Sequence, residues 1–257
     1  MLDLWTGTPG RTLVIAHRGG AALAPENTVA ALQAAAVAGA DAIETDIRLT
    51  RDGAVVCVHD ADLIRLCNDP RAVSYVELAS LRRLLPGMMT LSEALAASAS
   101  LGVLLDFKLG DAAALLRVID EIERADAVSR AMLGLRSLAL IHAARARSAD
   151  IAILAFLDDR DSAEAAQAVG ADWFRLWQGA ASADRAAAVR RAGLRLAVMV
   201  GQPRSVALPE YPPFPVGEVD GGGLATISKI GPDAILLDDP RLLTRTALSS
   251  DQQLASN

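Results

Sequence analysis

The sequence predicts a single α/β domain of the (β/α)8 class, the TIM barrel. Three observations lead to this fold class. Short β-type runs alternate with Ala- and Leu-rich stretches of helical period along the chain. Glycine-containing segments recur between a helical stretch and the following strand. The 257 residues allow about 32 residues for each of eight units, which is the size typical of this barrel.

The predicted strands run from residue 13 to residue 237. Nine segments carry the β-type pattern, and eight βα units result if the second and third segments belong to one unit. The segments cover residues 13–16, 42–46, 54–58, 103–107, 132–135, 151–156, 172–176, 194–200 and 234–237.

The predicted helices lie between these strands, for example at residues 29–38 and 112–123. Four of the glycine-containing segments follow a helical run, where glycine readily takes the left-handed conformation that ends a helix. They begin at Gly39, Gly170, Gly193 and Gly231. A doubly wound open sheet is the structural alternative. The first strand-to-helix turn, residues 17–22, argues against it because it lacks a G-x-G-x-x-G pattern.

Two segments depart from the alternation. Residues 201–223 form a long Pro-rich loop that follows the seventh predicted strand, so in a barrel it lies on the active face. Tyr211 and Phe214 in this loop are candidates for an apolar wall, and a surface excursion or a dimer contact is the other interpretation. We expect one barrel domain over residues 1–248 and a polar tail over 249–257.

Composition and charge exclude several classes of protein. The chain is 52% hydrophobic, enough for a full core, and carries a net charge of −6 with no basic run, so we expect no nucleic-acid partner. No apolar run approaches the ~18 residues of a membrane span. Because residues 1–11 also lack a signal-peptide pattern, we expect a cytoplasmic protein without stable membrane insertion. A homo-oligomer remains open.

Candidate catalytic residues follow the predicted strands. His17 and His59 each end a strand-like run, and active sites of barrels are built at the carboxyl ends of their strands. Glu44 and Asp46 are two residues apart on one strand and therefore face the same side. Asp106 ends another strand.

Three buried carboxylates require a neutralising cation. Their oxygen ligands suit one hard divalent ion, Mg²⁺ or Ca²⁺. The alternative is that Glu44, Asp46 and Asp106 form separate ion pairs with Arg48 and Lys108.

A phosphate site is predicted beside these acids. Arg18 follows His17, and Lys108 lies two residues after Asp106, so a guanidinium and an ammonium flank the acidic residues. Asn27 or Thr28 is the expected N-cap of the first helix. Glu26, and with it Asn27, is a candidate for orienting the residues of the site.

Taken together, these motifs resemble the glycerophosphodiester phosphodiesterase family. The resemblance is dense over residues 13–108, thin over 109–230, and returns at 231–243. It rests on His17-Arg18-Gly19, Pro25-Glu26-Asn27-Thr28, Gly39-Ala40-Asp41, Glu44-x-Asp46, Thr50-x-Asp52-Gly53, His59-Asp60, Thr90-Leu91, Asp106-x-Lys108, Gly231-x-Asp233 and Asp238-Asp239-Pro240.

The resemblance implies a TIM barrel that hydrolyses glycerophosphodiesters, small-molecule substrates, to glycerol 3-phosphate and an alcohol. It implies that His17 and His59 are the acid/base pair and that Glu44, Asp46 and Asp106 bind the metal. Arg18 and Lys108 would bind the phosphate. The attacking oxygen is either water or the substrate's own glycerol hydroxyl, and the sequence does not choose between them.

The chain departs from the family pattern in three places. Asp106 stands where the family has Glu, so it reaches the metal either directly or through water. The seventh strand lacks the tryptophan often found near its end, and Trp177 near the end of the sixth strand is the candidate replacement for that substrate wall. The segment between His59 and Thr90 is short, which predicts a small inserted cap.

Two alternative functions remain open. One is a related barrel phosphodiesterase that cleaves lysophospholipid, sphingolipid or sugar phosphodiesters. The other is a non-catalytic barrel that binds phosphoesters, which the Asp106 departure favours and the presence of both histidines disfavours.

Overall fold

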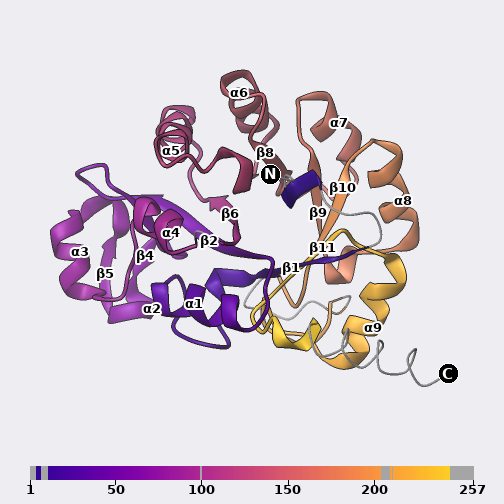
Figure 1. Cartoon of the computed structure of the whole chain (residues 1–257), viewed down its shortest axis with the longest axis horizontal. Coiled ribbons are helices and arrows are strands. Elements are labelled where there is room, and N and C mark those ends of the chain that lie inside the picture. Colours follow the sequence, from indigo (N-terminus) through magenta and orange to yellow (C-terminus); the bar gives the residue numbers. More distant parts are fainter. Residues whose placement is uncertain (1–3, 7–10, 99, 204–208, 210, 244–257) are drawn as a thin grey trace.

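The computed structural model describes residues 4–6, 11–98, 100–203, 209 and 211–243. Eight parallel strands form a barrel, and it is closed because β1 pairs with both β11 and β2 (Figure 1). This confirms the predicted fold class and excludes the open sheet. The barrel strands are β1 (Leu13–Ala16), β2 (Ala42–Leu49), β6 (Gly102–Phe107), β7 (Ala131–Leu135), β8 (Ala152–Ala155), β9 (Trp173–Trp177), β10 (Arg195–Met199) and β11 (Ala234–Leu237).

The predicted segment at residues 54–58 is not a barrel strand but β3 (Val55–Cys57), which runs antiparallel to β2 with Cys57 opposite Ile47. The second and third predicted strands therefore belong to one unit, as eight units require. The chain then forms a small insertion of two short strands and three short helical segments before returning to the barrel. These are β4 (Asp62–Leu63), α2 (Ile64–Cys67), β5 (Asp69–Ala72), η3 (Val73–Tyr75) and α3 (Leu78–Leu84).

Helices surround the barrel (Figure 1). Their ends follow local chemistry: the Thr28 side chain caps the first helix, and Thr90 forms a capping box with Glu93 at α4. Gly39 and Gly231, like the other two predicted glycines, have positive φ at the point where a helix gives way to a strand. The helices are α1 (Val29–Val37), α4 (Leu91–Ala97), α5 (Ala112–Arg124), α6 (Leu138–Arg147), α7 (Ala163–Ala168), α8 (Ala183–Arg191) and α9 (Gly221–Ile230).

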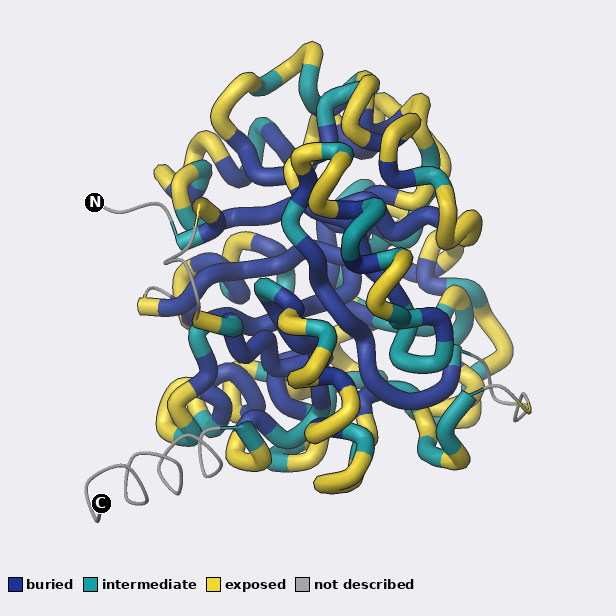
Figure 2. The backbone as a smooth tube through the Cα atoms, turned by 90° about the vertical axis from the view of Figure 1, so that its right-hand side faces the viewer, coloured by how far each residue is buried: buried dark blue, intermediate teal, exposed yellow. Residues whose placement is uncertain are grey.

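Alternation along each strand separates two buried layers. On β2, Ile43 and Ile47 belong to the layer between the strands and the helices, whereas Ala42 belongs to the cluster that contains Trp5 and Trp173. Glu44 and Asp46 share the parity of Ala42, so they face into the barrel. The residues of the barrel strands are almost all buried, and Figure 2 shows long buried stretches of chain inside the molecule. The barrel interior is therefore apolar up to the level at which these acids appear.

The Pro-rich loop ends earlier than the sequence predicted. Asp220 caps α9, which begins at Gly221, so the three glycines form the first helical turn rather than the loop. The predicted polar tail, residues 249–257, lies outside the described residues. No helix in the described part of the chain has both the length and the apolar character needed to cross a membrane.

Candidate active site

His17 lies where β1 ends, and its orientation is set by a tight backbone turn. Arg18, Gly19 and Gly20 have φ values of 50, 79 and 98°. A Cβ on Gly19 would lie 2.7 Å from a methyl group of Leu32, so this turn requires glycine. The turn directs the buried His17 ring so that its Nδ1 lies 2.6 Å from Oδ1 of Asp238, just after β11.

The hydrogen bond to Asp238 leaves His17 Nε2 on the side of Glu44, 3.9 Å from its Oε2. Burial disfavours the charged imidazolium, but the hydrogen bond to Asp238 and the negative charges of Glu44 and Asp238 outweigh burial and raise the pKa of His17. A histidine whose Nδ1 is hydrogen-bonded to a carboxylate and whose Nε2 faces the site is suited to proton transfer.

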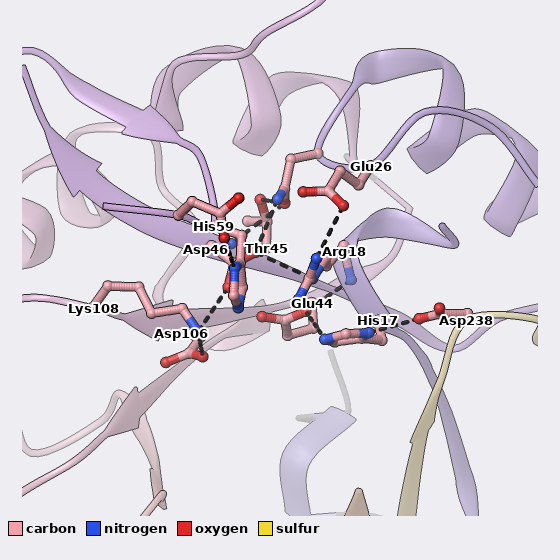
Figure 3. A network of polar contacts seen from close by, with 12 residues as sticks. His17, Arg18, Glu26, Glu44, Thr45, Asp46, His59, Asp106, Lys108 and Asp238 are labelled. Carbon is pink, nitrogen blue, oxygen red and sulfur yellow. Dashed lines mark hydrogen bonds and ion pairs between the residues drawn. The ribbon is translucent and has the colours of Figure 1, made fainter. Parts of the chain in front are cut away.

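The three predicted acidic residues meet at the mouth of the barrel. Asp46 and Asp106 are direct partners in the β2–β6 register, and Glu44 is two residues before Asp46 on the same face. One oxygen from each of the three carboxylates lies within 4.8 Å of the others, and all three residues are buried. In Figure 3, the Glu44 carboxyl extends between the His17 ring and the pair formed by Lys108 and Asp106.

Cationic side chains approach this cluster from both sides. Lys108 Nζ lies 3.0 Å from Asp46 Oδ1 and forms an ion pair with Asp106. Arg136, the residue after β7, also binds Asp106 through Nε at 3.1 Å and Nη2 at 2.5 Å. The interpretation as ion pairs therefore holds for Asp106, which has two cationic partners. Arg48 does not take part in an ion pair among the described residues.

The cations do not neutralise the cluster evenly. Burial and the charge of Asp46 raise the pKa of Glu44 to about 7. Burial disfavours the charged form of Asp46 too, but Lys108 and other neighbouring positive groups lower its pKa. Asp46 Oδ1 is buried, and its contact among the described residues is the ion pair with Lys108 Nζ. These oxygens fit a divalent ion at this position.

His59 reaches the same mouth by a route that the sequence did not predict. The strand it follows, β3, is not a barrel strand but an antiparallel partner that returns along the extension of β2. The backbone N–H of Val58 donates to Asp46, and Arg48 Nε donates to the His59 carbonyl, which holds this return in place. The His59 Nδ1 lies 2.7 Å from Asp60 Oδ1. Burial, and the positive charges of Lys108 and Arg18, lower the pKa of His59.

Glu26 and Asn27 contact other residues of the site. Asn27 is buried in a left-handed conformation, φ 55°, and its Nδ2 donates to Asp46 Oδ2 at 2.9 Å. Its Oδ1 accepts the Thr45 hydroxyl. Glu26 accepts Arg18 Nη1 at 3.0 Å and a bidentate pair from Arg65. Arg18 is thereby held beside Asp46, with its buried Nε unbonded among the described residues.

A cavity of about 750 Å³ opens above these residues. His17, His59, Arg18 and Lys108 all line it, so both histidines share one cavity. Trp177 lines it as well, and its role as a substrate wall stays a prediction. The Pro-rich loop contributes the apolar residues Pro213, Phe214, Pro215 and Val216.

Sequence reasoning missed four residues of the site. Asp238 and Asp60 belong to motifs already noted, but their bonds to the histidines join residues through tertiary contact. Arg136 and Arg175 carried a usable signal, because each is a charged residue at or in an apolar strand, 131–135 and 173–177.

Curated relatives match part of the chain. The chain is 51% identical over 75 residues to a probable glycerophosphodiester phosphodiesterase 1 of Mycobacterium tuberculosis, covering 29% of this chain and 27% of that protein. It is 44% identical over 78 residues to a glycerophosphodiester phosphodiesterase of Caldanaerobacter subterraneus, covering 30% and 32%. The matched segments thus span about a third or less of these curated relatives.

Solved structures share the fold over most of the chain. A putative glycerophosphodiester phosphodiesterase of Galdieria sulphuraria superposes with a TM-score of 0.78 at 17% identity, covering 92% of this chain and 98% of that one. A phosphodiesterase of Oleispira antarctica in complex with the product sn-glycerol-3-phosphate has a TM-score of 0.75 at 20% identity, covering 92% and 96%. The model of the glycerophosphoryl diester phosphodiesterase family matches residues 17–198, more than half of the sequence, and the chain therefore belongs to that family.

Proposed function

We propose that this protein hydrolyses glycerophosphodiesters to glycerol 3-phosphate and an alcohol. One observation carries the proposal: two carboxylate-backed histidines, an acidic cluster and buried cations face a single cavity. The names of the curated relatives and the product bound in the Oleispira structure support the substrate class.

Glu44, Asp46 and Asp106 would hold one divalent cation, Mg²⁺ or Ca²⁺. The carboxylate oxygens that lie within 4.8 Å of one another and the raised pKa of Glu44 support this fit. When bound, such a cation offsets the charge that grows on the phosphate oxygens in the transition state. Lys108 contacts both Asp46 and Asp106, but Arg136 binds Asp106 alone, so we propose that Asp106 is the weakest of the three ligands.

Side chains of the site would bind the phosphate and transfer the protons. Arg18 and Lys108 are fixed by Glu26 and Asp106 and would bind the phosphate oxygens. One histidine takes the proton from the attacking oxygen, and the other gives a proton to the leaving alkoxide. Asp238 and Asp60 hold each imidazole by Nδ1, which leaves each Nε2 as the atom that moves the proton.

Substitution of the histidines tests the proposal. We expect His17→Ala and His59→Ala each to lower kcat at least ~100-fold on glycerophosphoethanolamine while the melting temperature shows a folded protein. His142→Ala is the matched control, because His142 is exposed on α6 and completes the three histidines of the chain. Near-full activity in either variant would disprove the two-histidine scheme.

A lysophospholipid substrate is the second candidate function, because Phe214, Trp177 and the loop prolines give the cavity an apolar side. A panel of glycerophosphocholine, glycerophosphoethanolamine and lysophosphatidylcholine separates the two functions. The cytoplasmic location and a homo-oligomer stay predictions.

A further inference from the structure

Three arginines line one half of the cavity. Arg48 comes from the end of β2, Arg136 follows β7, and Arg175 lies on β9. In the barrel these strands belong to the run from β2 to β9, whereas His17 and Asp238 come from β1 and the end of β11. We call these three residues the arginine wall. The phosphate-binding role proposed above for Arg18 and Lys108 does not use them.

Arg175 is the most constrained member of the arginine wall. It is 5% exposed, and its Cζ lies 4.7 Å from the ring centre of Trp177 and 5.3 Å from that of Phe156. In the described part of the chain, its guanidinium makes no hydrogen bond and no ion pair. Burial and the like charge of Arg136 lower its pKa to about 10, so it stays charged at neutral pH. The charges of Asp106 and Asp158 act on it from a distance, but neither forms an ion pair with it. A buried cation without a direct ion pair is stabilised when an anion enters the cavity.

Arg136 lies close to Arg175, and Arg48 lines the same cavity. The Arg136 Cζ is 5.5 Å from the centre of the same Phe156 ring, so the guanidinium groups of Arg136 and Arg175 approach one aromatic ring. Arg136 also binds Asp106, which places the arginine wall next to the acidic cluster. Arg48 donates Nε to the His59 carbonyl and has no ion pair in the described ranges.

The arginine and lysine side chains of the cavity are not equally paired. Six of them line it, and four form ion pairs in the described part of the chain: Arg18 and Arg65 with Glu26, and Lys108 and Arg136 with Asp106. Arg48 and Arg175 line the cavity without an ion pair among the described residues. Because the substrate phosphate is assigned to Arg18 and Lys108, these two arginines are left to contact a further anion.

We propose that the arginine wall is a second anion subsite that selects phosphodiesters whose alcohol carries a further carboxylate or phosphate. This inference rests on the proposed function for the bond that is cleaved. The planar guanidinium of Arg175, held between two rings, is preorganised for a bidentate contact with such a group. A choline or ethanolamine cation would instead meet like charge at this position.

Pairs of substrates that differ by one anionic group test the proposal. Glycerophosphoserine differs from glycerophosphoethanolamine by a carboxylate, and glycerophosphoglycerol phosphate differs from glycerophosphoglycerol by a phosphate. We expect kcat/KM to favour the more anionic member of at least one pair by roughly tenfold or more. The pair with the larger ratio identifies which anion the subsite takes.

Substitution of single arginines then tests which side chains cause the preference for the more anionic substrate. We expect Arg175→Met to reduce the ratio to about twofold or less, since the contact with the anion is removed. Arg48→Met is the second variant. Because Arg48 is more exposed than Arg175, we expect this variant to lower the ratio less than Arg175→Met does. Arg195→Met is the matched control: Arg195 lies on β10 with its Cζ 4.6 Å from the Trp173 ring, outside the cavity, so this variant keeps the ratio of the unmodified protein.

Equal kcat/KM values within both pairs would overturn the subsite. Absence of hydrolysis with all four substrates would instead contradict the proposed function. In that case the subsite is tested by calorimetry, which compares the affinity of the protein for O-phosphoserine with its affinity for phosphoethanolamine. Tighter binding of O-phosphoserine by about tenfold, lost in Arg175→Met, supports the subsite. Equal binding overturns it.

Discussion

Asp238→Asn isolates the role of the carboxylate that holds His17. The two groups are 221 residues apart in sequence but only 2.6 Å apart in the structure, and the Asp238 side chain is 18% exposed. Asparagine preserves the shape and removes the charge. Because the hydrogen bond and the charge of Asp238 both raise the pKa of His17, their loss moves the titration of His17 to lower pH.

The magnitude follows from the kind of hydrogen bond that is lost. A hydrogen bond to a charged group contributes about 1.5–3 kcal/mol, and one between neutral groups about 0.5–1.5 kcal/mol. The difference is about 1–1.5 kcal/mol, which corresponds to roughly tenfold in an equilibrium or a rate. We therefore expect kcat to fall about tenfold. A further loss follows if the neutral His17 ring carries its proton on Nε2 instead of Nδ1, because Nε2 then no longer accepts a proton.

Nitrogen NMR of the imidazole rings measures this effect without reference to activity. The chain has three histidines, and His17→Ala assigns the resonance of interest. Asp239→Asn is the control, because Asp239 bonds Arg241 at 2.8 Å at the surface. The reasoning is refuted if His17 titrates at the same pH in Asp238→Asn and in the unmodified protein while both remain folded.

Two further predictions concern the same site. Gly217→Ala should reproduce the titration shift of Asp238→Asn, because a Cβ at this residue, φ 86°, would lie 2.0 Å from Asp238 Oδ1. It should also reduce the free energy of unfolding by about 1–2 kcal/mol, which a denaturant titration measures. A chelator should abolish hydrolysis, and Mg²⁺ or Ca²⁺ should restore it and raise the melting temperature. Glu44→Gln should lose the thermal shift, and activity that is indifferent to chelator would mean that the acidic residues serve only in ion pairs.

Features that depend on neighbours in the sequence were predictable. The alternation of strands and helices and the positive φ at glycines such as Gly39 and Gly170 follow from local conformational preferences. The common orientation of Glu44 and Asp46 follows from the two-residue period of a strand. The resemblance of spaced motifs then predicted the family that the comparisons confirm.

Features that depend on register between distant strands required the tertiary structure. The pairing of His17 with Asp238 arises because the first and last strands close the barrel, and no local pattern encodes that distance. His59 reaches the mouth only because β3 runs back antiparallel along β2, a pairing that the sequence alone did not predict. Arg136 binds Asp106 because β6 and β7 are adjacent. The sequence therefore determined which chemical groups each strand carries, whereas closure of the barrel decided which groups meet.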